Sequence, residues 1–278
     1  MKKRLIINLI LLIVLLTLVG LVWLKPGQET AKQQRLVNLD IKAINSIRIE
    51  RSPADIIELK KHQQHWVLTS PIEANALAGK VERLLKISQI EPPTSYPLDH
   101  SSMQRFGLQP PVARMSFNNI EVLIGKTENV NARRYVSTGN QLFLLDDTFL
   151  HHLTAPVSSY IDNRLLPDDV QITALKTPSI QLQQTKDHSW RNSLKPKQAL
   201  SADAVQILFD EWRFARAISV NATMNEEQGE SITLQFNNQP SLHFTLIKKT
   251  DTVLLINNDK QLAYSFSPKK YQQMTTLK

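Results

Sequence analysis

Residues 57–68 (IELKKHQQHWVL) and residues 180–190 (IQLQQTKDHSW) decide the fold of this chain of 278 residues. In both stretches, apolar and polar side chains alternate, a polar turn follows, and a tryptophan opens the next segment. Alternation with a period of two predicts β-strands, and the polar turn predicts a hairpin. The same hairpin therefore occurs twice. We expect its tryptophans, Trp66 and Trp190, to be buried in two separate cores.

The elements after each hairpin also recur in the same order. Apolar residues at helical spacing predict a helix after the first hairpin and another that Ser201 caps. Phe117-Asn-Asn119 is then matched by Phe236-Asn-Asn238, within series of short strands separated by polar turns. Such ordered matches indicate a duplication. We predict an α+β protein with two tandem repeats, residues 44–168 and 169–278, each packing a helix on an antiparallel sheet.

A long apolar segment lies near the N-terminus. It begins at Leu5, ends at Leu24 and contains almost no polar side chain. A helix of about twenty residues spans a bilayer core. Three basic residues precede the segment, and Trp23 lies where an interfacial aromatic residue belongs. Residues 1–25 are therefore predicted to form a cytoplasmic tail and a transmembrane anchor in the inner membrane, with a cleaved signal peptide as the alternative.

Both alternatives export the remainder of the chain. Residues 26–43 are polar, and we expect them to form a juxtamembrane linker. The charge excess is small once the N-terminus is set aside, because four of the eight net positive charges fall within the first 25 residues. The rest alternates basic and acidic residues, so we expect no nucleic-acid binding. The body is predicted to be periplasmic.

Composition and motifs argue against most catalytic classes. The chain has no cysteine and only seven glycines, so disulfides, thiolate metal sites and cysteine nucleophiles are excluded. It has no local motif of a nucleotide-binding protein, a serine hydrolase or a zinc protease. The close histidine pairs lack a flanking third ligand. We therefore expect no catalysis, no metal and no cofactor.

Several segments resemble a bacterial family, the domain of unknown function numbered 4340. They include Arg105-Phe-Gly-Leu-x-Pro110, Val122-Leu-Ile-Gly125 and Asp162-Asn-Arg-Leu-Leu166, and the resemblance covers about residues 44–278. It implies an envelope protein with one N-terminal membrane segment, in some cases associated with components resembling those of gliding-motility ABC transporters. It brings no catalytic residues to transfer.

Two hypotheses of function follow. The first is a membrane-anchored accessory or scaffold protein that binds partner proteins of an envelope or ABC-transport-type complex, without catalysis. The alternative is an envelope enzyme or ligand-binding module with its site in the cleft between the repeats.

Two candidate sites accompany these hypotheses. Residues 252–256 are apolar and uncharged, and we predict that they form a free sheet edge where Leu254 and Ile256 contact a partner. Arg133 and Arg134 are adjacent on a predicted strand. They are the candidate contact for an anionic group or, alternatively, charges that protect an edge strand.

Overall fold

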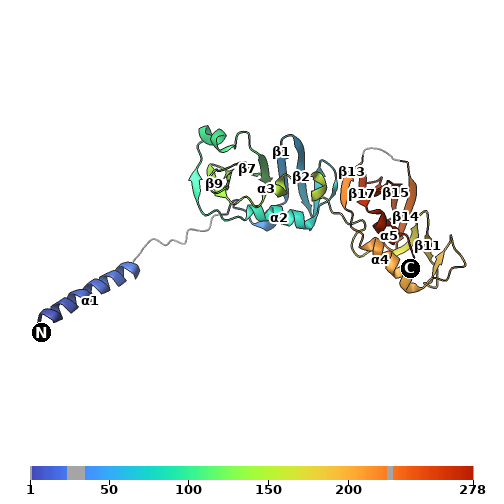
Figure 1. Cartoon of the computed structure of the whole chain (residues 1–278), viewed down its shortest axis with the longest axis horizontal. Coiled ribbons are helices and arrows are strands. Elements are labelled where there is room, and N and C mark those ends of the chain that lie inside the picture. The colour runs from blue at the N-terminus through green and yellow to red at the C-terminus, as the bar shows by residue number, and fades with distance from the viewer. Residues whose placement is uncertain (1, 24–34, 224–227, 278) are drawn as a thin grey trace.

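The computed structural model describes residues 2–23, 35–223 and 228–277, and consists of an N-terminal helix, α1 (Lys2–Trp23), followed by two units of sheet and helices (Figure 1). The first unit contains 3-10 helices (η), strands and helices in the order η1 (Ile41–Ala43), β1 (Ser46–Arg51), β2 (Ala54–His62), β3 (His65–Ser70), β4 (Ala74–Asn75), α2 (Ala78–Ser88), β5 (Ser95–Pro97), η2 (His100–Phe106), β6 (Ala113–Phe117), β7 (Ile120–Thr127), β8 (Arg134–Thr138), β9 (Gln141–Leu145), α3 (Leu150–Leu153) and η3 (Val157–Tyr160). The second unit contains β10 (Ile172–Lys176), β11 (Gln181–Gln184), β12 (Trp190–Asn192), α4 (Ala202–Arg213), β13 (Ser219–Ala222), β14 (Glu230–Phe236), β15 (Leu242–Lys248), β16 (Val253–Asn257), β17 (Leu262–Phe266) and α5 (Pro268–Met274).

The two sheets have the same order of strands. The first sheet runs β4-β3-β2-β1-β6-β7-β8-β9-β5, and the second runs β12-β11-β10-β14-β15-β16-β17-β13. When β10 to β12 are matched with β1 to β3, β13 with β5, and β14 to β17 with β6 to β9, only β4 has no counterpart. The pairs are antiparallel throughout, which confirms the α+β class with antiparallel sheets. The shared order is what a duplicated unit requires.

The predicted helices form, and their apolar side chains at helical spacing are buried. On α2, Val81, Leu84 and Ile87 are buried, as apolar residues at helical spacing should be. The Oγ atom of Ser201 accepts a hydrogen bond from the Ala204 N–H at 3.0 Å, so Ser201 is the N-cap of α4 as predicted.

The tryptophans differ from the prediction. Trp66 and Trp190 are only half-buried and pack against the edge of the core. The fully buried tryptophan is Trp212 on α4, whose Nε1–H donates to the Met274 carbonyl at 2.6 Å. The prediction that both tryptophans are buried was wrong because Trp66 and Trp190 lie on strands at or near one end of each sheet, where few elements cover them.

No helix in the part of the chain that the structure describes is long and apolar enough to cross a membrane. Of the residues named for the anchor, Leu24 lies outside the described residues, and so do the side chains of Leu5 and Trp23.

The first unit begins before the predicted end of the linker at residue 43. Leu36 and Val37 are buried, and the Leu36 N–H donates to the Ile90 carbonyl at 2.7 Å, just after α2. The second unit begins in the same way, because the Leu165 N–H donates to the Ala215 carbonyl at 3.2 Å, just after α4. Each unit therefore opens with a short segment that is hydrogen-bonded to the residues just after its own helix, and the boundary at residue 168 also lies too late.

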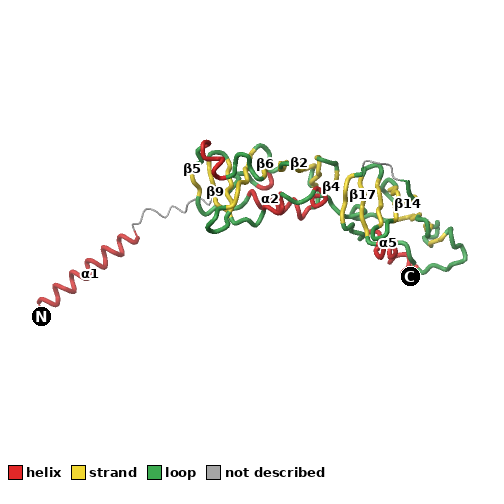
Figure 2. Tube along the Cα trace, turned by 45° about the horizontal axis from the view of Figure 1, so that its top comes forward, coloured by secondary structure: helices red, strands yellow, loops and turns green. Residues whose placement is uncertain are grey.

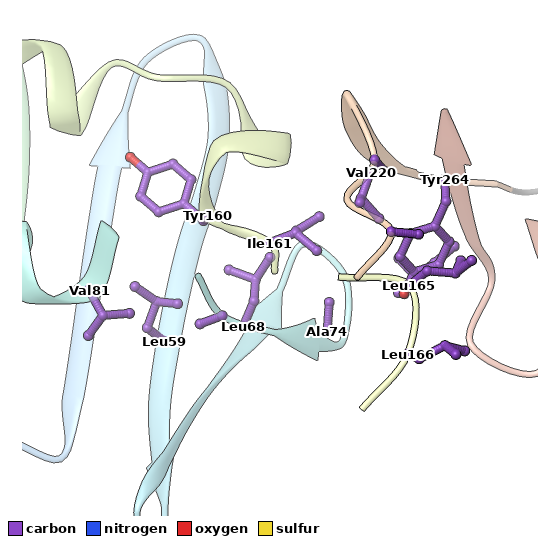
Figure 3. Packing of buried hydrophobic residues seen from close by; sticks show 14 of the residues in the cluster. Leu59, Leu68, Ala74, Val81, Tyr160, Ile161, Leu165, Leu166, Val220 and Tyr264 are labelled. Atoms are coloured by element: carbon purple, nitrogen blue, oxygen red, sulfur yellow. The ribbon is translucent and has the colours of Figure 1, made fainter. Parts of the chain in front are cut away.

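Residues 160–166, which we call the strap, join the two units. On the first unit, the Tyr160 carbonyl accepts from the Leu77 N–H and the Asp162 N–H donates to the Asn75 carbonyl, both at 2.8 Å. On the second unit, the Asn163 carbonyl accepts from the Ala217 N–H at 2.8 Å. Figure 3 shows strap side chains between the apolar residues of both units. One continuous cluster of buried residues therefore extends through the body.

The strap occupies the inner ends of both sheets. It lies along β4 on one side and along the segment before β13 on the other. The outermost strands that remain are β5 and β12, and their neighbours in the sheets, β9 and β11, lie at opposite ends of an elongated body (Figure 1). β5 itself lies at one of these ends (Figure 2). An unpaired edge strand presents main-chain donors and acceptors to a partner.

Candidate functional site

A cleft with a volume of about 430 Å³ lies where the two units meet. Its walls come from β3 and β4, from the strap, from Leu242 at the start of β15, and from β16, β17 and the turn between them. The polar residues that line it are Glu73, Asn75, Asp162, Arg164, Asn257, Asp259, Lys260 and Tyr264. The alternative hypothesis expected a cleft here, although its polar residues come from three distant segments that no sequence motif connects.

An ion pair within the strap lines the cleft. The Oδ2 atom of Asp162 lies 2.7 Å from Nε and 2.5 Å from Nη2 of Arg164, and Oδ1 accepts from the Arg164 N–H at 3.1 Å. Arg164 also pairs with Asp168. Hydrogen bonds to Asp162 and then to Asp168 raise the pKa of Arg164 above its ordinary value. The guanidinium charge is therefore permanent and is neutralised within the strap.

Tyr264 supplies a neutral hydroxyl to the same cleft. Burial, and to a lesser extent the charge of Asp162, raise the pKa of Tyr264 to about 12. The phenol is therefore protonated at neutral pH and can donate a hydrogen bond to a ligand. At the mouth, Glu73, Asp259 and Lys260 are exposed and form no ion pair with a described residue. They are available to bind a charged group.

This arrangement suits binding better than catalysis. The buried carboxylate of Asp162 is engaged by Arg164, and the tyrosine titrates far above neutral pH, whereas an acid–base pair needs groups poised near the working pH. Within the described ranges, no group of three histidine, aspartate or glutamate side chains could hold a metal ion. The cleft fits a small polar molecule or the end of a peptide chain.

The predicted partner-binding edge is wrong. β16 pairs with β15, where Leu254 lies opposite Ile247, and also with β17, where Leu254 lies opposite Ser265. Ile256 is buried in the same strand. The run of apolar, uncharged residues that suggested an available edge marks instead a strand bonded on both sides, which needs no protection by charge.

The two arginines of the candidate anion contact already have carboxylate partners. β8 is an inner strand between β7 and β9, so Arg133 and Arg134 do not protect an edge. Arg134 is buried, with its Nη2 atom 2.5 Å from Oδ2 of Asp147. Arg133 lies 3.5 Å from Oδ1 of Asp146 at the surface. The aspartates are adjacent in sequence, and together they neutralise both charges.

Two of the segments that resemble a known family, residues 105–110 and residues 122–125, pack on one another. A side chain at Gly125 on β7 would bring its Cβ atom to 2.4 Å from the Phe106 carbonyl and 3.1 Å from the Leu108 side chain. The Phe106 and Tyr135 rings lie 4.8 Å apart over this contact. Gly107 has a φ of +67°, a conformation that favours glycine. Residues 106–108 can therefore pack closely on β7 only because position 125 is a glycine.

The profile of the family described as Domain of unknown function (DUF4340) matches residues 66–231, more than half of the chain. The chain belongs to the DUF4340 family. The matched part of this DUF4340 protein contains the strap, both cleft-lining strands of the first unit, and β12. No curated protein and no solved structure matches the chain.

A buried lysine lies beside the strap. Lys80 on α2 is 5% exposed, and its Nζ atom lies 4.7 Å from the centre of the Tyr160 ring. It forms no ion pair with a described carboxylate. Burial, and then the charges of Arg83 and Arg51, lower the pKa of Lys80 to about 8. The charged form of Lys80 therefore destabilises the folded state.

We expect the stability of this protein to rise with pH between about 8 and 10.5, the folded and ordinary pKa values of Lys80. In this window the unfolded state binds more protons, so the free energy of unfolding increases with pH. Lys80→Met should raise the free energy of unfolding at neutral pH by about 2 kcal/mol and flatten the rise. Urea unfolding at several pH values measures both effects. Lys86→Met, on the exposed face of α2, is the control, and an equal rise in all three proteins would contradict the assignment.

Proposed function

We propose that this DUF4340 protein is a membrane-anchored scaffold that binds partner proteins on the outer face of the bacterial inner membrane, without catalysis. The observation that carries the proposal is the architecture of the body. Two similar sheets are joined end to end by the strap, which leaves β5 and β12 as the outermost strands of an elongated body (Figure 1). Such a body can hold partners apart and offer them main-chain hydrogen bonds.

The N-terminal segment supports the membrane part of the proposal. Within α1, side chains such as Leu11 and Leu16 are each 61% exposed, so the chain itself does not cover them. Large apolar side chains in such a row require another apolar environment, which a bilayer supplies. The basic residues before the segment favour a cytoplasmic N-terminus and a periplasmic body. The family resemblance suggests components of an envelope or ABC-transport-type complex as partners.

Topology is the first test. A C-terminal alkaline phosphatase fusion should be active, and N-terminal sequencing of the membrane-bound protein should begin at Met1 or Lys2. An inactive fusion would contradict the periplasmic location, and sequencing that begins near Lys25 would show a cleaved signal peptide instead of an anchor.

Partner binding needs a separate test. The full-length protein, crosslinked in cells and purified from detergent-solubilised membranes, should retain specific envelope proteins. Recovery of the protein alone, under conditions that preserve known membrane complexes, would contradict the scaffold function.

The cleft favours a second candidate, a ligand-binding module. Its specific support is that the neutral hydroxyl of Tyr264 lines the same cavity as the exposed charges of Asp259 and Lys260, which pair with no described residue. A thermal-shift screen of small polar metabolites should then find compounds that raise the melting temperature of the wild type. Leu242→Trp, whose ring would fill the cleft, should abolish that shift. If no compound in the screen raises the melting temperature, the ligand-binding function is contradicted.

A further inference from the structure

We propose that β12 binds an extended segment of a partner protein, in which apolar and acidic residues alternate, as one added antiparallel strand. The inference rests on the proposed scaffold function and names its binding site and the chemistry of its partner.

The first unit shows how this end of the sheet accepts a strand. Beyond β3, the Ala76 N–H donates to the Trp66 carbonyl at 2.9 Å, and β4 pairs Ala74 with Leu68. The strap then lies along β4, through the bond from the Asp162 N–H to the Asn75 carbonyl. Two extended segments therefore follow β3 in the first unit.

The second unit lacks both of these segments. β12 is the counterpart of β3, and it is the last strand of its sheet. The Ser193 N–H donates to the Gln181 carbonyl, and the Thr185 N–H to the Ser189 carbonyl, each at 2.9 Å. Since inward and outward pairs alternate in an antiparallel ladder, the main-chain groups of Trp190 point away from β11.

One outward carbonyl of β12 is unpaired within the described ranges, whereas the Asn192 carbonyl accepts from the Lys195 N–H at 3.2 Å. The Trp190 carbonyl, the counterpart of the bonded Trp66 carbonyl, has no hydrogen bond to any residue in the described ranges. An edge strand offers such an open carbonyl to a partner, so β12 can accept a hydrogen bond from one more strand at Trp190.

The side chains of β12 determine which residue types the added strand of the partner must contain. Trp190 packs on Phe209 of α4, with ring centres 4.8 Å apart, on one face of the sheet. Neighbouring residues on a strand point to opposite faces, so Arg191 lies on the other face, where it is exposed. An added strand would therefore meet apolar surface on one face and positive charge on the other.

Two more exposed cations follow β12 in the loop that leads to α4. Lys195 and Lys197 are exposed, and like Arg191 they form no ion pair with a described residue. Acidic residues at alternate positions of the partner would complement all three charges. A second copy of β12 would bring like charges together, so the same residues oppose self-pairing.

A synthetic peptide tests the proposal. The probe is a fluorescein-labelled peptide of alternating valine and glutamate, titrated with the full-length protein in detergent and followed by fluorescence anisotropy. We expect saturable binding that weakens about tenfold or more when Arg191, Lys195 and Lys197 are all changed to glutamate. The matched control changes Lys42, Lys249 and Lys269 to glutamate, which alters net charge equally at exposed positions away from β12. That control should bind the peptide far more tightly than the β12 variant.

An N-methylated peptide separates strand addition from simple charge attraction. It keeps every side chain but lacks N–H donors at alternate positions, so it should not bind. Absence of binding by the original peptide, equal binding of the N-methylated form, or equal weakening by the control variant would each overturn the proposal. The scaffold function is judged separately, by topology and by recovery of partners from membranes.

Discussion

Trp212→Ala should lower the free energy of unfolding by about 4 kcal/mol. Trp212 is fully buried, and its Nε1–H donates to the Met274 carbonyl, so one side chain ties α4 to the last helix, α5. Truncation leaves a large cavity and an unpaired carbonyl. Both effects lower the free energy of unfolding, and their contributions add. Urea unfolding followed by far-ultraviolet circular dichroism measures the change.

Trp190→Ala is the matched control for this substitution. Trp190 belongs to the same unit, but it is half-buried at the end of the sheet, so its truncation should cost clearly less, because less apolar surface is lost from the core. Trp212→Phe should recover part of the loss by refilling the cavity without restoring the hydrogen bond. Equal effects of the two alanine variants would show that α4 does not form the centre of the buried packing in the second unit.

Asp147→Ala should lower the free energy of unfolding by about 3 kcal/mol. The substitution leaves the guanidinium of Arg134 buried with the Gly125 carbonyl as its remaining acceptor, at 2.6 Å. Removing one member of a buried ion pair leaves the other charge without a partner in a poorly solvated site. Chemical unfolding of the purified protein gives the value.

The neighbouring residue provides the control for Asp147. Asp146 pairs with Arg133 at 3.5 Å, and the Asp146 side chain is 84% exposed. Asp146→Ala should therefore change stability by less than about 0.5 kcal/mol, as expected for an exposed pair. A double variant, Arg134→Met with Asp147→Ala, should be more stable than Asp147→Ala alone, because it removes the stranded charge. The reverse order would contradict a structural role for this pair.

The order of the elements was predictable from the sequence, but their neighbours in the sheet were not. The alternating residues around Trp66 and Trp190 predicted the two hairpins. The apolar residues at helical spacing after Ser201 predicted α4. Periodicity reports which face of a strand is buried, not whether both of its sides are hydrogen-bonded. Residues 252–256 were therefore mistaken for a free edge, although β16 lies between β15 and β17.

The cleft and the strap could not be predicted for a different reason. Residues 160–166 have no periodicity of their own, and their conformation depends on main-chain bonds to Asn75, Leu77 and Ala217. A useful signal was present, since Arg35-Leu-Val37 and Arg164-Leu-Leu166 open the two units alike. Polar residues from three distant segments then meet only in the folded chain.

Site-specific photocrosslinking in intact cells tests most directly whether this protein is a scaffold that binds partners at the far end of its body. A photoreactive amino acid replaces Arg191 on β12 in one strain and Lys269 on the exposed start of α5 in another. The account predicts a discrete adduct with an envelope protein from position 191 only, with the crosslink mapping to an extended segment of alternating apolar and acidic residues. No adduct at position 191, or the same adducts from both positions, would contradict it.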